Sequence, residues 1–152
     1  MRALAGMTPP IEGSCLCGAV TYVCAAPPFW SVNCHCRACQ KLSGAPYVSA
    51  FSVPADSLVF EGETRPFHRL SEAGHQVTTW HCEACGTRMF AQSAGATGHM
   101  NIFAATLADP STFKAISNVY LSEAAPWVEP PAARFNFQKM PGLPETPQST
   151  SS

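Results

Sequence analysis

The chain has little charge. Only 12% of its 152 residues are Asp, Glu, Lys or Arg, about half the share found in an ordinary domain. The formal net charge is −1, and the sequence lacks the basic patch that nucleic-acid binding requires, so nucleic acid is not an expected partner. No apolar run approaches the roughly 18 residues that span a bilayer. We therefore expect a soluble protein that acts away from the membrane.

A secretory signal is also missing from the start of the sequence. The first ten residues, MRALAGMTPP, contain no apolar segment of sufficient length before Pro9 and Pro10. Eight cysteines could form four disulfides, but their CxC and CxxC spacings favour shared metal ligation, which a reducing compartment preserves. We expect a cytoplasmic protein whose cysteines bind metal.

The sequence lacks the alternation of strands and long helices that a parallel α/β sheet requires, and it has no internal repeat of solenoid length. Short segments rich in Val, Phe, Tyr, Trp and Thr recur instead between turns containing Gly or Pro. This pattern predicts a mainly β fold of antiparallel sheets. The expected strands cover 19–23, 46–53, 57–60, 76–80, 87–91, 99–104 and 116–121.

One helix of about two turns is predicted from Arg37 to Ser43, because Gly44 stands where helices commonly end. Residues 1–10 are expected to form a flexible N-terminus and residues 11–140 one zinc-binding domain. Residues 141–152, PGLPETPQSTSS, have the Pro, Ser and Thr content of a disordered tail.

Four cysteines form two complementary pairs. Cys82 and Cys85, followed by a glycine, have the spacing of a zinc knuckle, and Cys15 and Cys17 form a tighter pair that must lie on a turn to share a metal. Together they would close a four-thiolate structural zinc site. Buried inert thiols are the alternative for each pair. Cys24 has no neighbour at ligand spacing and is interpreted as a packed small hydrophobic residue.

A second group contains three cysteines in the segment CHCRAC: Cys34, Cys36 and Cys39. Three thiolates can converge on a second zinc from a loop and the first turn of a helix, and the amide groups of that turn favour negative sulfur. The fourth position would be open to water or substrate, which is typical of a reactive zinc site. Alternatively, His35 or another ligand from the chain closes the site and makes it structural.

Several other polar residues are candidates for a role at these sites. His35 is flanked by two ligands, so its ring is expected to project away from the shared metal. Arg37, Lys41 and Arg88 could hold the carboxylates of an anionic substrate, although solvated cations are the favoured interpretation.

The three cysteine motifs, taken in order, resemble the glutathione-dependent formaldehyde-activating enzyme family, whose domain is shared with centromere protein V. The resemblance rests on GSCLCGAVTY (13–22), CHCRACQKLSG (34–44) and CEACGTRMF (82–90), and it covers roughly residues 11 to 130. It implies a mainly β, Mss4-like fold of folded antiparallel sheets with one or two short helices and two zinc ions. His81 departs from the pattern, because an aromatic apolar residue usually precedes the CxxC pair.

The resemblance also implies a carbon–sulfur lyase. The family's named activity joins formaldehyde and glutathione to S-hydroxymethylglutathione, so the expected partner is a small thiol such as glutathione. By motif match, Cys15, Cys17, Cys82 and Cys85 would hold the structural ion and Cys34, Cys36 and Cys39 the functional one. The alternative is a zinc-stabilised binding or scaffold module without catalysis. A methionine sulfoxide reductase would need a reactive cysteine outside both groups, and Cys24 lies in an apolar setting that does not suit that role.

Overall fold

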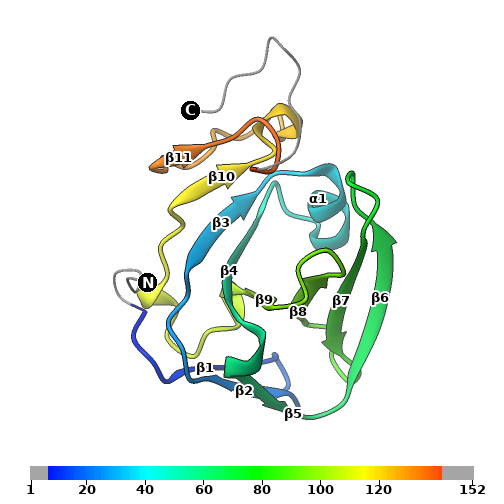
Figure 1. The fold of residues 1–152 in the computed structure, drawn as a ribbon, viewed down its shortest axis with the longest axis vertical. Coiled ribbons are helices and arrows are strands. Elements are labelled where there is room, and N and C mark those ends of the chain that lie inside the picture. Colours follow the sequence, from blue (N-terminus) through cyan, green and yellow to red (C-terminus); the bar gives the residue numbers. More distant parts are fainter. Residues whose placement is uncertain (1–6, 142–152) are drawn as a thin grey trace. The chain divides into compact units, whose positions relative to one another are not determined.

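A computed structural model of the chain describes residues 7–141 and confirms a mainly β fold (Figure 1). Its one α-helix among these residues, α1 (Arg37–Ser43), has the predicted bounds and ends at Gly44, whose φ of 73° lies in the left-handed region. None of the described helices is long and apolar enough to cross a membrane. The segments expected to be flexible are 1–10 and 141–152, of which residues 1–6 and 142–152 lie outside the described residues. Met7, within the first of these segments, is buried in the core.

The chain divides into two compact units, each assembled from two separate stretches of sequence. The first unit comprises Met1–Trp30 and Phe51–Lys114, and the second comprises Ser31–Ala50 and Ala115–Ser152. Strand β4 (Val48–Pro54) begins in the second unit and ends in the first. The boundaries of the zinc-binding domain given above stay a prediction.

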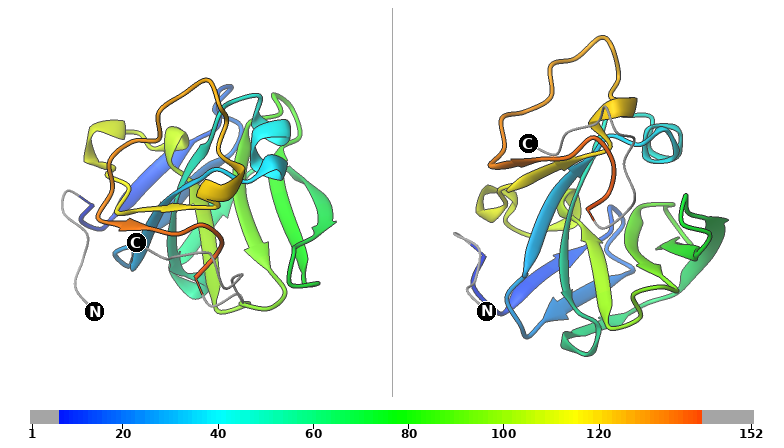
Figure 2. Two further views of the ribbon diagram at one scale, coloured as in Figure 1. Left: turned by 90° about the horizontal axis from the view of Figure 1, so that it is seen from above. Right: turned by 45° about the horizontal axis from the view of Figure 1, so that its top comes forward.

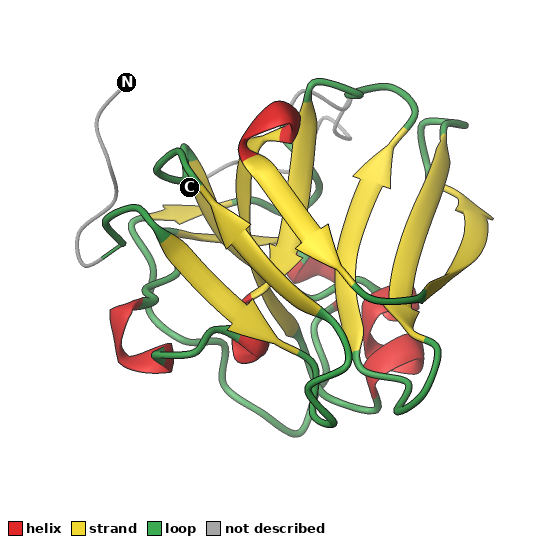
Figure 3. Ribbon diagram, turned by 90° about the horizontal axis from the view of Figure 1, so that it is seen from below, coloured by secondary structure: helices red, strands yellow, loops and turns green. Residues whose placement is uncertain are grey.

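The first unit consists mainly of antiparallel strands. Its elements are β1 (Ile11–Ser14), β2 (Thr21–Cys24), η1 (Ala55–Ser57), β5 (Leu58–Glu61), β6 (Thr64–Leu70), β7 (Gln76–Cys82), β8 (Arg88–Ser93), β9 (His99–Phe103), η2 (Ala104–Thr106) and η3 (Pro110–Thr112). Strands, drawn in yellow in Figure 3, make up most of the regular structure. One sheet has the order β1-β2-β5, and a second set of paired strands has the order β9-β8-β7-β6. Short turns join most of these strands, so most strands that follow one another in the sequence also pair with one another.

An apolar core fills the first unit. In β2 alternate residues point inward, so that Tyr22 and Cys24 are buried. The Tyr22 ring meets Phe90 edge to face at 5.6 Å, and Phe60 approaches Phe90 at 5.0 Å. Gly13 in β1 makes room for this packing, because a Cβ there would lie 2.3 Å from the Tyr22 hydroxyl. The apolar residues that alternate along these strands thus pack together in a single core.

The second unit is different, because it contains two parallel strand pairs and many of its buried side chains are polar. Its strands β3 (Trp30–Cys34), β10 (Ser117–Val119) and β11 (Phe135–Asn136) have the order β11-β10-β3, and η4 (Leu121–Glu123) follows β10 (Figure 2). Among the described residues of this unit, six polar side chains are buried: Ser31, Asn33, His35, Gln40, Ser117 and Asn118. Hydrogen bonding, rather than apolar packing, therefore specifies much of this interior.

The buried thiol of Cys24 predicts a loss of stability at alkaline pH. Burial raises its pKa from an ordinary 9.0 to about 12, so the unfolded chain ionises first. The free energy of unfolding is therefore undiminished by this thiol below pH 9.0 and falls as the pH rises from there to about 12. We expect Cys24→Ala to lose about 1 kcal/mol less stability than wild type between pH 8 and 10. Urea denaturation across this range checks the prediction, and parallel curves for the two proteins would contradict it.

Candidate metal centres

Four cysteines converge in the first unit, and we call them the four-cysteine group: Cys15, Cys17, Cys82 and Cys85. Their sulfur atoms all lie within 4.8 Å of one another. The Sγ of Cys17 is 3.6 Å from that of Cys15 and 3.8 Å from that of Cys82. The structure thus brings together two pairs that are more than sixty residues apart in the sequence.

Tight turns aim these four sulfurs at one point. Residues 15–18 turn sharply between β1 and β2, with the amide of Gly18 donating to the carbonyl of Cys15. Gly18 has a φ of 81°, a conformation that glycine adopts without a steric penalty. The Val20 amide donates to Cys15 Sγ at 3.2 Å, and the Cys85 amide donates to Cys82 Sγ at 3.5 Å. Such amide donors stabilise thiolates.

Thr87, which sequence reasoning did not single out, joins the two turns. Its hydroxyl accepts a hydrogen bond from the Leu16 amide at 3.1 Å and lies 3.1 Å from Cys85 Sγ. Its carbonyl accepts from the Cys82 amide. The only sequence signal was its place two residues after the CxxC pair. Thr87 therefore holds the turn of Cys15 and Cys17 against the turn of Cys82 and Cys85.

The metal-free thiols of this group differ in acidity. Hydrogen bonds from the Thr87 hydroxyl and amide lower the pKa of Cys85 to about 5. Burial opposes ionisation of Cys15, but the Val20 amide and the neighbouring thiols lower its pKa overall. The Ala19 amide favours the Cys17 thiolate, yet Cys15, burial and the other thiols together raise the pKa of Cys17 to about 11. Four thiolates this close need a cation to share their charge.

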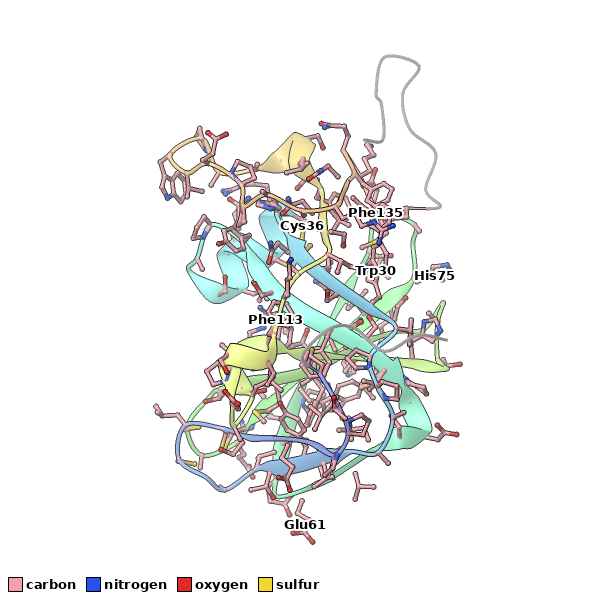
Figure 4. All side chains as sticks on the ribbon, turned by 90° about the vertical axis from the view of Figure 1, so that its left-hand side faces the viewer. Trp30, Cys36, Glu61, His75, Phe113 and Phe135 are labelled. Carbon is pink, nitrogen blue, oxygen red and sulfur yellow. The ribbon has the colours of Figure 1, made fainter. Side chains whose placement is uncertain are left out.

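Three further cysteines converge in the second unit, and we call them the three-cysteine group: Cys34, Cys36 and Cys39. Their sulfur atoms also lie within 4.8 Å of one another. Cys34 ends β3, and Cys36 caps α1, where its Sγ accepts from the Cys39 amide at 3.3 Å (Figure 4). Within residues 7–141, no fourth His, Cys, Asp or Glu has its donor atom equally close to all three sulfurs.

The expectation that the helix start favours negative sulfur holds for Cys36, which receives the amide hydrogen bond. It does not hold for Cys34 in the metal-free protein. Hydrogen bonds with Cys36 and Cys39, together with burial, raise the pKa of Cys34 well above its ordinary value. A metal ion at this group would displace that proton.

A residue distant in sequence supports the three-cysteine group. Glu123, at the end of η4, accepts the Arg37 amide through Oε1 at 2.8 Å. Its backbone carbonyl accepts from Gln40 Nε2 at 2.9 Å, and the Gln40 Oε1 accepts from the Arg37 guanidinium at 2.5 Å. Glu123 and Gln40 thereby hold the first turn of α1 in place. No local sequence pattern could have paired Glu123 with this helix.

The other candidate residues lie apart from the cysteine sulfurs. His35 is fully buried, and its ring contacts Asn118 and Tyr47 rather than completing the three-cysteine group. His81 lies in β7 opposite Arg65 and is no member of the four-cysteine group. The interpretation of Arg88 as a solvated cation is wrong, because it is partly buried with its guanidinium 4.3 Å from the centre of the Phe103 ring.

Both cysteine groups fit a tetrahedral metal with thiolate ligands. Zinc–sulfur bonds of about 2.3 Å place the sulfurs about 3.8 Å apart at the corners of a tetrahedron. The separations of 3.6 and 3.8 Å in the four-cysteine group match this geometry. The three-cysteine group supplies thiolate donors of the same kind for three of the four tetrahedral positions.

The fold and the two cysteine groups define a mainly β protein that could hold two metal ions. Its sequence matches the family model described as glutathione-dependent formaldehyde-activating enzyme over residues 10–123, which contain all seven cysteines of both groups. The chain belongs to this family, as the three motifs predicted.

Similarity to other known proteins is more distant. A crystal structure of a Rhodobacter sphaeroides protein, a structural-genomics target, resembles this chain with a TM-score of 0.52. The two share 18% sequence identity, and the similarity covers 64% of this chain and 87% of the other. This likeness shows a shared fold. No curated protein matches the sequence.

Proposed function

We propose that this protein is a zinc-dependent carbon–sulfur lyase that acts on a small thiol adduct such as S-hydroxymethylglutathione. The observation that supports the proposal is the three-cysteine group, which lacks a fourth protein donor among the described residues. Zinc sites with three protein ligands keep a position for water or substrate, whereas sites with four are structural. The family's name supplies the substrates, glutathione and formaldehyde.

In the proposed site, Cys34, Cys36 and Cys39 hold the functional zinc. That ion would supply Lewis acidity, which polarises a carbonyl and favours the thiolate of a bound thiol. In the reaction, the thiol sulfur bonds to the aldehyde carbon and the thiol proton ends on the former carbonyl oxygen; the lyase direction reverses both changes. The chain's own contribution is positioning: the Cys39 amide stabilises Cys36 Sγ, and Glu123 fixes the helix start through the Arg37 amide.

The four-cysteine group is proposed to hold a second, structural zinc. Its four thiols complete a tetrahedral set and tie the turn after β1 to the end of β7. All eight cysteines are free thiols in the structure. Thiol ligands need a reducing environment, which supports a cytoplasmic location for the proposed enzyme.

Exchange between formaldehyde and glutathione tests the proposed activity. Hemithioacetals also form without a catalyst, so two-dimensional NMR exchange spectroscopy must compare zinc-loaded wild type with buffer. We expect wild type to accelerate the exchange and Cys39→Ser to lose the acceleration together with one zinc. Cys24→Ala, which removes a cysteine outside both groups, is the matched control and should behave as wild type. If wild type is no faster than Cys39→Ser or buffer, the substrate assignment fails.

Zinc removal should occur in two steps. Three thiolates bind zinc less tightly than four, so a mild chelator is expected to take the ion of the three-cysteine group first. Each release is followed with a colorimetric zinc indicator, and the remaining ion is identified by X-ray absorption. We expect an average of about four sulfur ligands around the ion that remains. Loss of both ions together, or retention of the three-sulfur ion alone, would contradict the assignment.

A further inference from the structure

The buried polar side chains of the second unit form a directed hydrogen-bond network that ends at the three-cysteine group. Asn33, Asn118 and Asn136 lie directly opposite one another on the neighbouring strands β3, β10 and β11. Asn118 is 1% exposed and connects to both of the others, at 3.3 Å and 3.0 Å. It also contacts His35, which stands between two of the cysteines.

The orientation of the Asn118 amide follows from its neighbours. The Pro131 carbonyl oxygen, 2.8 Å away, can only accept, so the group facing it must be the amide nitrogen of Asn118. The same nitrogen donates to Oδ1 of Asn136, whose own nitrogen is directed to the Ala133 carbonyl at 3.0 Å. The Oδ1 of Asn118 therefore faces His35 and Asn33.

This orientation fixes the proton on the His35 ring. The ring's Nε2 lies 3.0 Å from Asn118 Oδ1, which is an acceptor, so Nε2 must carry the hydrogen. The other ring nitrogen, Nδ1, is buried and has no hydrogen-bond partner among residues 7–141. A hydrogen there would be a buried donor left unsatisfied, whereas a lone pair costs less. The contacts thus favour one tautomer of the ring.

Two backbone contacts hold His35 as well. Its amide donates to the Val119 carbonyl at 3.0 Å, and its carbonyl accepts from Gln40 Nε2 at 2.6 Å. With the ring bound to Asn118, His35 is fixed at three points, and its neighbours Cys34 and Cys36 are fixed with it. The buried ring also lies 5.0 Å from the Tyr47 ring, which restricts its rotation.

We propose that His35 is a positioning residue of the three-cysteine group, held by Asn118 as the Nε2–H tautomer so that Cys34 and Cys36 keep the geometry of a metal site. The proposal depends on one part of the proposed function, namely that the three-cysteine group holds the second zinc. His35 acts through its neighbours and not as a ligand. Partners that orient metal ligands typically contribute about 10- to 100-fold to metal affinity.

The first test determines the tautomer of His35 in the wild-type protein. Long-range proton–nitrogen NMR of zinc-loaded wild type, repeated after zinc removal, separates pyrrole-type from pyridine-type ring nitrogens. The His35 signals are assigned by their absence in His35→Gln. We expect a pyrrole-type Nε2 and a pyridine-type Nδ1 in both states. A proton on Nδ1 would overturn the proposal, whether or not the protein catalyses the proposed reaction.

The second test compares two amide replacements. In His35→Gln the side-chain nitrogen reaches the position of Nε2 and can still donate to Asn118, whereas the shorter side chain in His35→Asn reaches only as far as Nδ1. We expect zinc release from the three-cysteine group to stay near the wild-type rate in His35→Gln. It should become about 10- to 100-fold faster in His35→Asn and in Asn118→Leu. Equal release rates in the Gln and Asn variants would overturn the proposal.

Two controls separate positioning from general misfolding. The zinc of the four-cysteine group reports the integrity of the first unit and should leave at the wild-type rate in every variant. His68→Gln replaces an exposed histidine of the first unit and should change neither rate. If wild type binds no second zinc, the proposed function fails, while the tautomer measurement still decides the role of Asn118.

Discussion

Cys82→Ala is expected to destabilise the protein on the order of 5 kcal/mol or more and to remove one zinc ion. Cys82 is 1% exposed, belongs to the apolar core and has its sulfur 3.8 Å from that of Cys17. Losing one of four thiolates opens the proposed structural site. Because a domain of this size has a total stability of only about 5–15 kcal/mol, much of the first unit should unfold.

Cys24→Ala is the matched control for this prediction. Cys24 is also a fully buried cysteine of the first unit, but it lies outside both cysteine groups. Its replacement removes the same atom and should cost about 1–2 kcal/mol with full zinc content retained. Thermal unfolding with zinc analysis distinguishes the two variants. A Cys82→Ala protein that keeps both zinc ions and the stability of Cys24→Ala would refute the structural role.

Phe90→Ala should have the second largest effect, a loss of about 3–5 kcal/mol. Phe90 is 1% exposed in β8 and contacts the rings of Tyr22 and Phe60. Truncation leaves a cavity between strands of the first unit that the surrounding rings can only partly fill. The effect should appear in the urea midpoint and leave the zinc content of the folded protein unchanged.

Phe60→Ala provides the comparison. Phe60 is the other ring of the same aromatic contact, but it is 41% exposed, so its truncation exposes less core and should cost about 1–2 kcal/mol. Urea denaturation of both variants measures the difference. Equal losses for Phe60→Ala and Phe90→Ala would show that burial in the core does not determine the contribution of these rings.

Helix α1 and most strands of the first unit could be predicted because their signals are local. The helix begins inside the CHCRAC motif and ends before Gly44, so the signals for both of its ends lie within nine residues. Strand β3 could not be predicted, since its buried positions are Ser31 and Asn33 while Trp30 and Val32 are only partly buried. Strands are recognised by buried apolar residues that alternate with exposed polar ones, and a strand whose buried side chains are polar lacks this pattern. Strand β6 (Thr64–Leu70) was missed because its residues are mostly exposed and include a proline.

The parallel pairing of the second unit was equally invisible in the sequence. The sequence predicts a strand at 116–121, where β10 lies, but with three residues in β10 and two in β11 no pattern shows which strands they pair with. Their place beside β3 depends on contacts such as that between Asn33 and Asn118, which are more than eighty residues apart. Antiparallel neighbours joined by short turns were predictable, whereas this long-range arrangement was not.

The cysteines of the candidate site were predictable for the same reason that α1 was. Their spacing within CxC, CxxC and CHCRAC already limits which sulfurs can share an ion. The residues that hold those sulfurs were not found, because Glu123 and Asn118 carry no motif and meet the metal loop only in the folded chain. Donor atoms can thus be read from the sequence, but their supports require the structure.

The discontinuous second unit has a consequence for synthesis on the ribosome. Cys34, Cys36 and Cys39 emerge together within six residues, whereas Asn118 and Glu123 follow about eighty residues later. For most of translation, the nascent chain therefore carries these thiols without the strand and turn that secure them. The first of the two cysteine groups to emerge complete is thus among the last parts of the chain to receive its native support, and during that interval its thiols are open to competing metals and oxidants.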